Sequence, residues 1–134
     1  MTRIQDQRPL SPHVGIYRWQ ISNTLSILHR VTGFALSFGM LVFAAWLISA
    51  AYYPDYHAPL QECLGSIVGK LFLFGWTWAF FYHLGNGIRH LNWDLGRGFT
   101  IPEMTRSGWV AVTFSLAMTV FTWAIIIRKV GLAV

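Results

Sequence analysis

The stretch LFLFGWTWAFFYHLGNGI, residues 71–88, contains no Asp, Glu, Lys or Arg and is bounded by Lys70 and Arg89. Its length is close to the ~20 residues that an α-helix needs to cross the ~30 Å hydrocarbon core of a bilayer. Two further runs, residues 31–54 and 107–127, also lack these four residue types. The three runs predict an all-α membrane protein with a bundle of three transmembrane helices.

The composition of the whole chain supports this class. Of its 134 residues, 54% are hydrophobic and 11% are charged, whereas a soluble domain carries about 25% charged residues. The formal net charge of +5 does not indicate a nucleic-acid partner, because the basic residues flank the apolar runs as membrane topology requires. The single cysteine, Cys63, excludes an internal disulfide and a CxxC metal site. Three membrane helices leave no room for a soluble catalytic domain.

The expected organisation is a polar N-terminal arm, residues 1–21, followed by a transmembrane domain, residues 22–130. The helices of that domain are predicted at about residues 22–52, 66–93 and 107–128. The segment between the first two, residues 53–59, is predicted to be a loop because it combines prolines with polar residues.

The arginines predict the orientation. The arm and the entry of the first helix carry four arginines and the second loop region carries three, whereas the first loop, residues 53–62, has no Lys or Arg. The positive-inside rule therefore places the N-terminus in the cytoplasm or mitochondrial matrix, and the C-terminus on the periplasmic or intermembrane side. The arm lacks the apolar core of a signal peptide. Direct insertion into a bacterial inner membrane is the simplest expectation, and a processed mitochondrial chain is the alternative.

His83 is the main candidate for chemistry. It lies six residues before Arg89, about 9 Å into the membrane at ~1.5 Å per residue. Ionisable residues inside membrane helices mark functional sites by default, and neutral imidazole is a good ligand for haem iron. Gly85 and Gly87 would let a flat macrocycle approach the backbone. The alternatives are a histidine bonded to a neighbouring helix and glycines used for close helix packing. Because no second histidine is expected at this depth, a six-coordinate haem would need its second ligand from another chain.

Two pairs of basic residues lie near the predicted cytoplasmic boundary, namely His29 with Arg30 and Arg89 with His90. They could bind the anionic propionates of such a haem. Positive-inside anchoring would also explain the arginines, but not the histidines. Asp94, four residues after His90, would orient that histidine, pair with an arginine of a partner or remain a solvated acid.

A second candidate site begins in the first helix. Ser26, His29, Arg30 and Gly33 fall at i, i+3, i+4 and i+7, which is one helical face, and Trp19 lies two turns earlier on the same side. A hydroxyl, a guanidinium and an aromatic ring at the membrane boundary suit a quinone, whose carbonyl oxygens accept hydrogen bonds. An interfacial anchor at a helix start is the alternative.

Three motifs then resemble those of the cytochrome b subunits of succinate dehydrogenase (respiratory complex II). They are RPLSPH at residues 8–13 followed by Ile16-Tyr17, SILHRVTG at residues 26–33, and HLGNGIRHLNWD at residues 83–94. The combination of HR-x-TG with H-x3-GIRH-x3-D is specific, and the resemblance covers nearly the whole chain.

The resemblance implies a membrane anchor that pairs with a second small three-helix subunit and carries an iron–sulfur subunit and a flavoprotein. In that family succinate is oxidised at the flavin and electrons pass to ubiquinone. The chain would contribute the quinone site and no catalytic residue for succinate. The resemblance also implies a haem b between the two anchors, with His83 as the ligand to its iron and the second ligand from the other anchor. The further implied residues are His29, Arg30 and His90 near the propionates, and Ser26, Arg30, Trp19 and Ile27 in the quinone pocket.

Other functions remain open at the level of sequence. An anchor for a quinol:fumarate reductase, which runs in the other direction, differs little in sequence. A purely structural, haem-free membrane anchor is a further alternative. A small proton or solute carrier is disfavoured, because three helices leave little room for a pathway and only His83 lies deep.

Overall fold

The structure is a computed structural model that describes residue 15 and residues 17–131. Most of the predicted N-terminal arm, including the RPLSPH motif, lies outside the described residues. The described part is all-helical, which confirms the predicted class. Its helices, in chain order, are α1 (Ile21–Tyr52), α2 (Pro54–Gly65), α3 (Ile67–Asp94) and α4 (Ile101–Val130).

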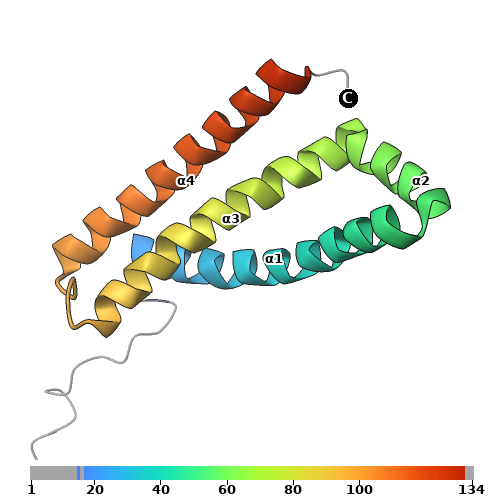
Figure 1. The fold of residues 1–134 in the computed structure, drawn as a ribbon. Coiled ribbons are helices and arrows are strands. Elements are labelled where there is room, and N and C mark those ends of the chain that lie inside the picture. The colour runs from blue at the N-terminus through green and yellow to red at the C-terminus, as the bar shows by residue number, and fades with distance from the viewer. Residues whose placement is uncertain (1–14, 16, 132–134) are drawn as a thin grey trace, which may run out of the picture.

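The central helix is α3, which lies between α1 and α4 and packs against both (Figure 1). α2 joins the end of α1 to the start of α3 (Figure 1). α1 and α4 also meet directly, where a Cβ added to Gly108 of α4 would lie 2.4 Å from Cδ1 of Leu25 of α1. The glycine therefore permits the close approach of the two outer helices.

The helices differ in how well they fit a membrane. α1 and the segment Ile101–Lys129 of α4 are each long and apolar enough to cross one. α2 and α3 meet the same requirement only as a pair, which is bent by 78° at the break between them. The described chain thus holds two to three candidate spans, compared with the three expected from its uncharged runs.

The prediction of a loop over residues 53–59 is wrong, because α2 covers most of it. Pro54 occupies the first turn, where a helix does not need its missing amide hydrogen. His57 is held to α1, since its Nδ1 lies 3.1 Å from Oγ of Ser49 and its ring centroid lies 5.5 Å from that of Trp46. These contacts stabilise a helix that Pro59, in its interior, would disfavour.

Capping residues set the starts of α3 and α4. Oγ of Ser66 accepts a hydrogen bond from the backbone N–H of Gly69 at 3.1 Å. Thr100 and Glu103 form a capping box at the start of α4. This box extends α4 back to Ile101, earlier than the predicted start at residue 107, because the prediction followed the uncharged run and the cap lies outside it.

The break predicted after the second long helix is confirmed. Gly96 and Gly98 have φ angles of 75° and 81° between α3 and α4. Side chains other than glycine rarely adopt this left-handed conformation, so the two glycines allow the chain to reverse there.

The interior is built from small and polar side chains. Its buried apolar residues are Leu25, Ala79, Tyr82 and Ala111, and its buried polar residues are Thr32, Ser49, Asn86, Arg89, Ser115 and Thr119. Small and hydroxyl-bearing residues are typical of contacts between membrane helices. Large apolar side chains such as Phe34, 78% exposed, lie outside. Lipid or another subunit would cover them in a membrane.

Candidate functional site

Three imidazole rings form a stack where α1 meets α3. The ring of His29 lies between those of His83 and His90, with centroid distances of 4.0 Å and 4.8 Å. The corresponding interplanar angles are 16° and 18°. The sequence placed His29 and His90 near one membrane boundary, and the structure adds that they contact each other and that His29 contacts His83.

One ring nitrogen of His83 is held by α1. Its Nδ1 lies 3.1 Å from the backbone carbonyl oxygen of His29 and 3.3 Å from Oγ1 of Thr32. The Thr32 hydroxyl donates to the carbonyl of Leu28 at 2.8 Å, which leaves its oxygen free to accept. Since a carbonyl can only accept, the proton is assigned to Nδ1, and the lone pair remains on Nε2. Metal-bound histidines commonly have this arrangement, in which the second nitrogen donates to a carbonyl.

The space around His83 is compatible with a ligand at Nε2. No residue in the described part of the chain forms a hydrogen bond with this nitrogen. A Cβ at Gly33 would lie 3.0 Å from Cε1 of His83, so the glycine makes room for the ring. A Cβ at Gly87 would have nothing within 4 Å, which leaves an open backbone patch one turn from His83. The donor set and the open patch therefore fit a haem ligated by His83.

His29 is closer to His83 than the sequence predicted. The expectation that no second histidine shares the depth of His83 is wrong, because the two rings stack at 4.0 Å. Stacked rings direct their nitrogens side by side, however, and no porphyrin fits between two faces in contact. His29 therefore cannot be the second axial ligand of an iron bound by His83, and that ligand still has to come from another chain.

His29 also has an unused nitrogen. Its Nδ1 is buried and has no hydrogen-bond partner among the described residues. Buried polar atoms are normally paired, so an orphaned one calls for a partner beyond the described residues. A carboxylate of a bound group would provide one.

Gly85 and Gly87, which were both predicted to let a haem approach the backbone, have different surroundings. A Cβ at Gly85 would lie 3.5 Å from Cβ of Ala111 and 3.5 Å from Cδ1 of Phe114, both on α4. Gly85 therefore serves helix packing, the alternative interpretation, and the prediction that it makes room for a macrocycle is wrong. Only Gly87 has the open surroundings which that role requires.

The donors of Arg89 are engaged by α4 and by its own helix. Its Nε donates to Oγ of Ser107 at 3.1 Å, its Nη1 to Oδ1 of Asn86 at 2.5 Å, and its Nη2 to the carbonyl of Met104 at 3.1 Å. The guanidinium lies over the ring of Trp93, and the residue is 8% exposed. Arg89 thus fastens α3 to α4, which contradicts its predicted role as a propionate donor.

His90 is oriented by the backbone. Its Nδ1 lies 2.7 Å from the carbonyl oxygen of Asn86, and its ring packs edge-on against Trp93. Asp94 is exposed and forms no hydrogen bond or ion pair with the residues that the structure describes. Of the three roles left open for Asp94, orienting His90 is therefore not borne out, and pairing with a partner or solvation remains for this acid.

The predicted quinone residues lie on α1 and just before it. Ser26 and Arg30 are exposed, and neither side chain forms a hydrogen bond within residues 17–131. Trp19 is 64% exposed and its indole N–H donates to Oγ1 of Thr24 at 2.7 Å. Ile27 is 48% exposed. The structure thus leaves two donors on α1 and an aromatic face just before it available, and neither Ser26 nor Arg30 forms a hydrogen bond with the stacked histidines.

The roles of two residues beside the site, Tyr82 and Thr32, were not predicted from the sequence. The buried hydroxyl of Tyr82, next to His83 in the chain, donates to the carbonyl of Leu25 at 3.0 Å and ties α3 to α1. Thr32 accepts from His83, as described above. The available signal was the position of Thr32, a hydroxyl three residues after His29 in an apolar run.

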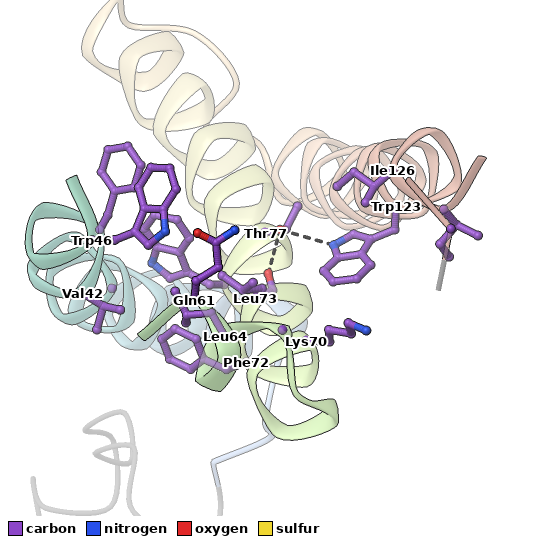
Figure 2. Close-up of a pocket in the computed structure, with 16 residues that line it drawn as sticks. Val42, Trp46, Gln61, Leu64, Lys70, Phe72, Leu73, Thr77, Trp123 and Ile126 are labelled. Atoms are coloured by element: carbon purple, nitrogen blue, oxygen red, sulfur yellow. Dashed lines mark hydrogen bonds between the residues drawn. The ribbon is translucent and has the colours of Figure 1, made fainter. Parts of the chain in front are cut away.

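A separate cavity of about 510 Å³ lies at the other end of the bundle, near α2 (Figure 2). Aromatic side chains from three helices line it, including Trp46, Trp76 and Trp123. The indole N–H of Trp123 donates to Oγ1 of Thr77 at 3.4 Å, as the dashed line in Figure 2 marks. None of the residues predicted for haem or quinone lines this cavity, so it is not part of the site.

Comparison with known proteins agrees with the motifs and the fold. The family described as succinate dehydrogenase/fumarate reductase transmembrane subunit matches residues 5–122. The chain is 48% identical over 120 residues to the succinate dehydrogenase cytochrome b556 subunit of Rickettsia felis, and the aligned region covers 90% of this chain and 94% of that protein. It is 43% identical over 115 residues to the mitochondrial succinate dehydrogenase cytochrome b560 subunit of Sus scrofa, and the aligned region covers 84% of this chain and 68% of that protein. The chain therefore belongs to the family of succinate dehydrogenase/fumarate reductase transmembrane subunits.

Proposed function

We propose that the chain binds haem b and ubiquinone as a membrane anchor, and passes electrons from succinate oxidation to the quinone. As a member of this family and a relative of the cytochrome b556 and b560 subunits, it is a membrane subunit of succinate dehydrogenase. The observation that carries the haem assignment is the state of His83. Its Nδ1 proton is directed to the carbonyl of His29, which leaves Nε2 free to bind iron.

A bound haem b would supply a one-electron redox group inside the membrane. In this chain, Nε2 of His83 would hold the iron, and the His29 carbonyl and the Thr32 hydroxyl would fix the orientation of the imidazole. The open backbone at Gly87 would face the macrocycle. The second axial ligand would come from the second anchor subunit, since the stacking of His29 excludes it from that role.

The propionates would lie among His29, Arg30 and His90. The orphaned, buried Nδ1 of His29 supports this placement, because a propionate oxygen would satisfy it. Arg30, exposed and without a partner in the described chain, would add a permanent positive charge.

The quinone would bind against the exposed face of α1. Ser26 and Arg30 would donate hydrogen bonds to a quinone oxygen, and Arg30 would stabilise negative charge on that oxygen as electrons arrive. Since its N–H is used by Thr24, Trp19 would contribute only its ring face, together with the apolar wall at Ile27. These residues are exposed in the isolated chain, so another subunit would complete the pocket.

The family relationship also supports a proposed assembly with further subunits. The chain would pair with a second three-helix anchor, and the two would hold an iron–sulfur subunit and a flavoprotein on the cytoplasmic or matrix side. The arm, residues 1–21, would lie on that side and the three-helix domain, residues 22–130, would cross a bacterial or mitochondrial inner membrane, with the C-terminus on the opposite face. A quinol:fumarate reductase anchor is the second candidate, because the family description covers both enzymes.

Purification of the complex through this chain tests the proposal. We expect a flavoprotein, an iron–sulfur subunit and a second anchor to copurify, and a reduced-minus-oxidised spectrum to show a b-type α band. Copurification without an α band would leave the structural-anchor alternative. A rate of fumarate reduction by the native quinol that exceeds the rate of succinate oxidation by the native quinone would favour the second candidate.

A further inference from the structure

A cavity of about 630 Å³ lies between the C-terminal end of α3 and the N-terminal end of α4. Its lining includes Arg97 and Arg106 at the helix ends and apolar side chains such as Val110 and Phe114 farther along α4. Gly85, which packs against α4, also lines it, whereas His83 contacts α1. The cavity therefore lies on the other side of α3 from the stacked histidines.

The end of the cavity near the helix termini has an excess of positive charge. Arg97 and Arg106 are exposed, and neither guanidinium forms a hydrogen bond or ion pair with the residues that the structure describes. Arg89 also lines the cavity but has its donors engaged, as described above. The one acid in the lining, Glu103, caps α4, where its Oε2 accepts from the Thr100 N–H at 3.2 Å and from the Thr100 hydroxyl at 2.6 Å. The cavity lining thus holds two unengaged cations and one carboxylate that is already bonded. This excess of positive charge favours the binding of an anion.

The same surface continues along α4 as an apolar groove. A second hollow of about 530 Å³ shares Arg106, Val110 and Phe114 with the first, and adds Trp109 and Thr113. Val110 and Trp109 are 61% and 57% exposed. A tryptophan at the level where charged side chains give way to apolar ones is typical of a membrane interface. The two hollows together form a surface with a cationic end and an apolar end.

We propose that this surface binds an anionic phospholipid. Its phosphate would accept hydrogen bonds from Arg97 and Arg106, since guanidinium groups bind phosphate with two parallel donors. An acyl chain would lie along Val110 and Phe114. Basic pockets between membrane helices suit such headgroups. An acidic protein surface or a free phosphate would use the arginines but not the groove, whereas a partner helix would use the groove without needing both arginines.

Two variants separate these occupants. The double variant Arg97→Gln/Arg106→Gln removes the cations, and Val110→Trp fills the groove but keeps them. Arg128→Gln, a change of the same kind at the far end of α4, is the matched control. The purified complex would be stripped of lipid and incubated with phosphatidylglycerol, phosphatidylcholine or inorganic phosphate, and bound molecules counted by native mass spectrometry.

We expect the wild-type complex and Arg128→Gln to retain phosphatidylglycerol in preference to phosphatidylcholine. Both test variants should lose at least about tenfold in phosphatidylglycerol occupancy, as expected from about 1.4 kcal/mol of lost contact. The haem spectrum and dye-coupled succinate oxidation should not change in any variant. Equal retention in all variants would overturn the proposal, as would no preference for the anionic lipid.

Two other outcomes would also overturn it. Loss of the iron–sulfur subunit from the arginine variant, with lipid binding unchanged, would mean that the arginines bind protein. Binding of inorganic phosphate that depends on the arginines and is unaffected by Val110→Trp, without any lipid binding, would reduce the surface to an anion site.

Discussion

The backbone carbonyl oxygen of His29 on α1 lies 3.1 Å from Nδ1 of His83 on α3. Because a carbonyl can only accept, the backbone of one helix determines which nitrogen of a histidine on another carries the proton. Whether Nε2 of His83 stays unprotonated and free to bind iron then depends on the distance between α1 and α3. Residues that set this distance are expected to affect the haem even where they do not touch it.

Thr32→Val removes the second acceptor at Nδ1 of His83 while keeping the size and shape of the side chain. The carbonyl of His29 remains, so we expect the haem to stay bound but its midpoint potential to change. Haem retention on dilution should fall about tenfold, a typical effect of losing an interaction that orients a metal ligand. Redox titration and haem content of the purified complex are the measurements. Thr122→Val is the control, since this hydroxyl donates within its own helix, to the carbonyl of Met118. A potential equal to that of the wild type would show that Thr32 does not act on His83.

Gly33→Ala should displace the ring of His83. The added Cβ would lie 3.0 Å from Cε1 of that ring, closer than ordinary contacts allow. We expect a lower haem content at normal expression of the chain. Gly75→Ala is the matched control on α3, because its Cβ would have nothing within 4 Å, and a helical alanine is favoured over glycine by about 1 kcal/mol. Equal haem content in both variants would mean that the ring has more freedom than the structure indicates.

Arg89→Ala should destabilise the packing of α4 on α3. The change leaves Asn86, Ser107 and the Met104 carbonyl without their donor. Each lost bond to a charged group costs about 1.5–3 kcal/mol when buried in a soluble protein and less in a membrane, so a total loss of about 3 kcal/mol is expected. Thermal denaturation of the complex in detergent measures it. Arg89→Lys should not restore stability, because an ammonium lacks the planar fork. An unchanged melting temperature in Arg89→Ala would contradict the assigned role.

Arg30→Ala and Ser26→Ala should separate quinone reduction from succinate oxidation. Both side chains are exposed and unbonded in the described chain, so their loss should not disturb the fold. We expect Arg30→Ala to lower quinone reduction by about 10²-fold, the effect of removing one donor to a developing oxyanion, and Ser26→Ala to lower it less. Oxidation of succinate by an artificial dye should remain. A parallel loss of both activities would indicate failed assembly instead of a damaged quinone site.

The sequence predicted the long helices because uncharged runs of membrane length leave the chain few alternatives. It failed at residues 53–59, where contacts of His57 with α1 stabilise a helix that local signals oppose. It also misassigned Gly85 and Arg89. Sequence spacing shows which residues share a face, but it does not show which neighbouring helix that face meets. The sequence showed a hydroxyl at Thr32 three residues after His29, but the contact of Thr32 with His83, 51 positions away, is shown only by the structure.

The most direct test of the haem assignment is the reduced-minus-oxidised spectrum of an assembled complex that carries His83→Ala. His57→Ala, which removes a histidine at the opposite end of the bundle, is the control. With all subunits present in both complexes, we predict that His83→Ala loses or severely alters the b-type α band while His57→Ala keeps it. An unchanged α band in the His83→Ala complex would contradict the assignment of His83 as the haem ligand.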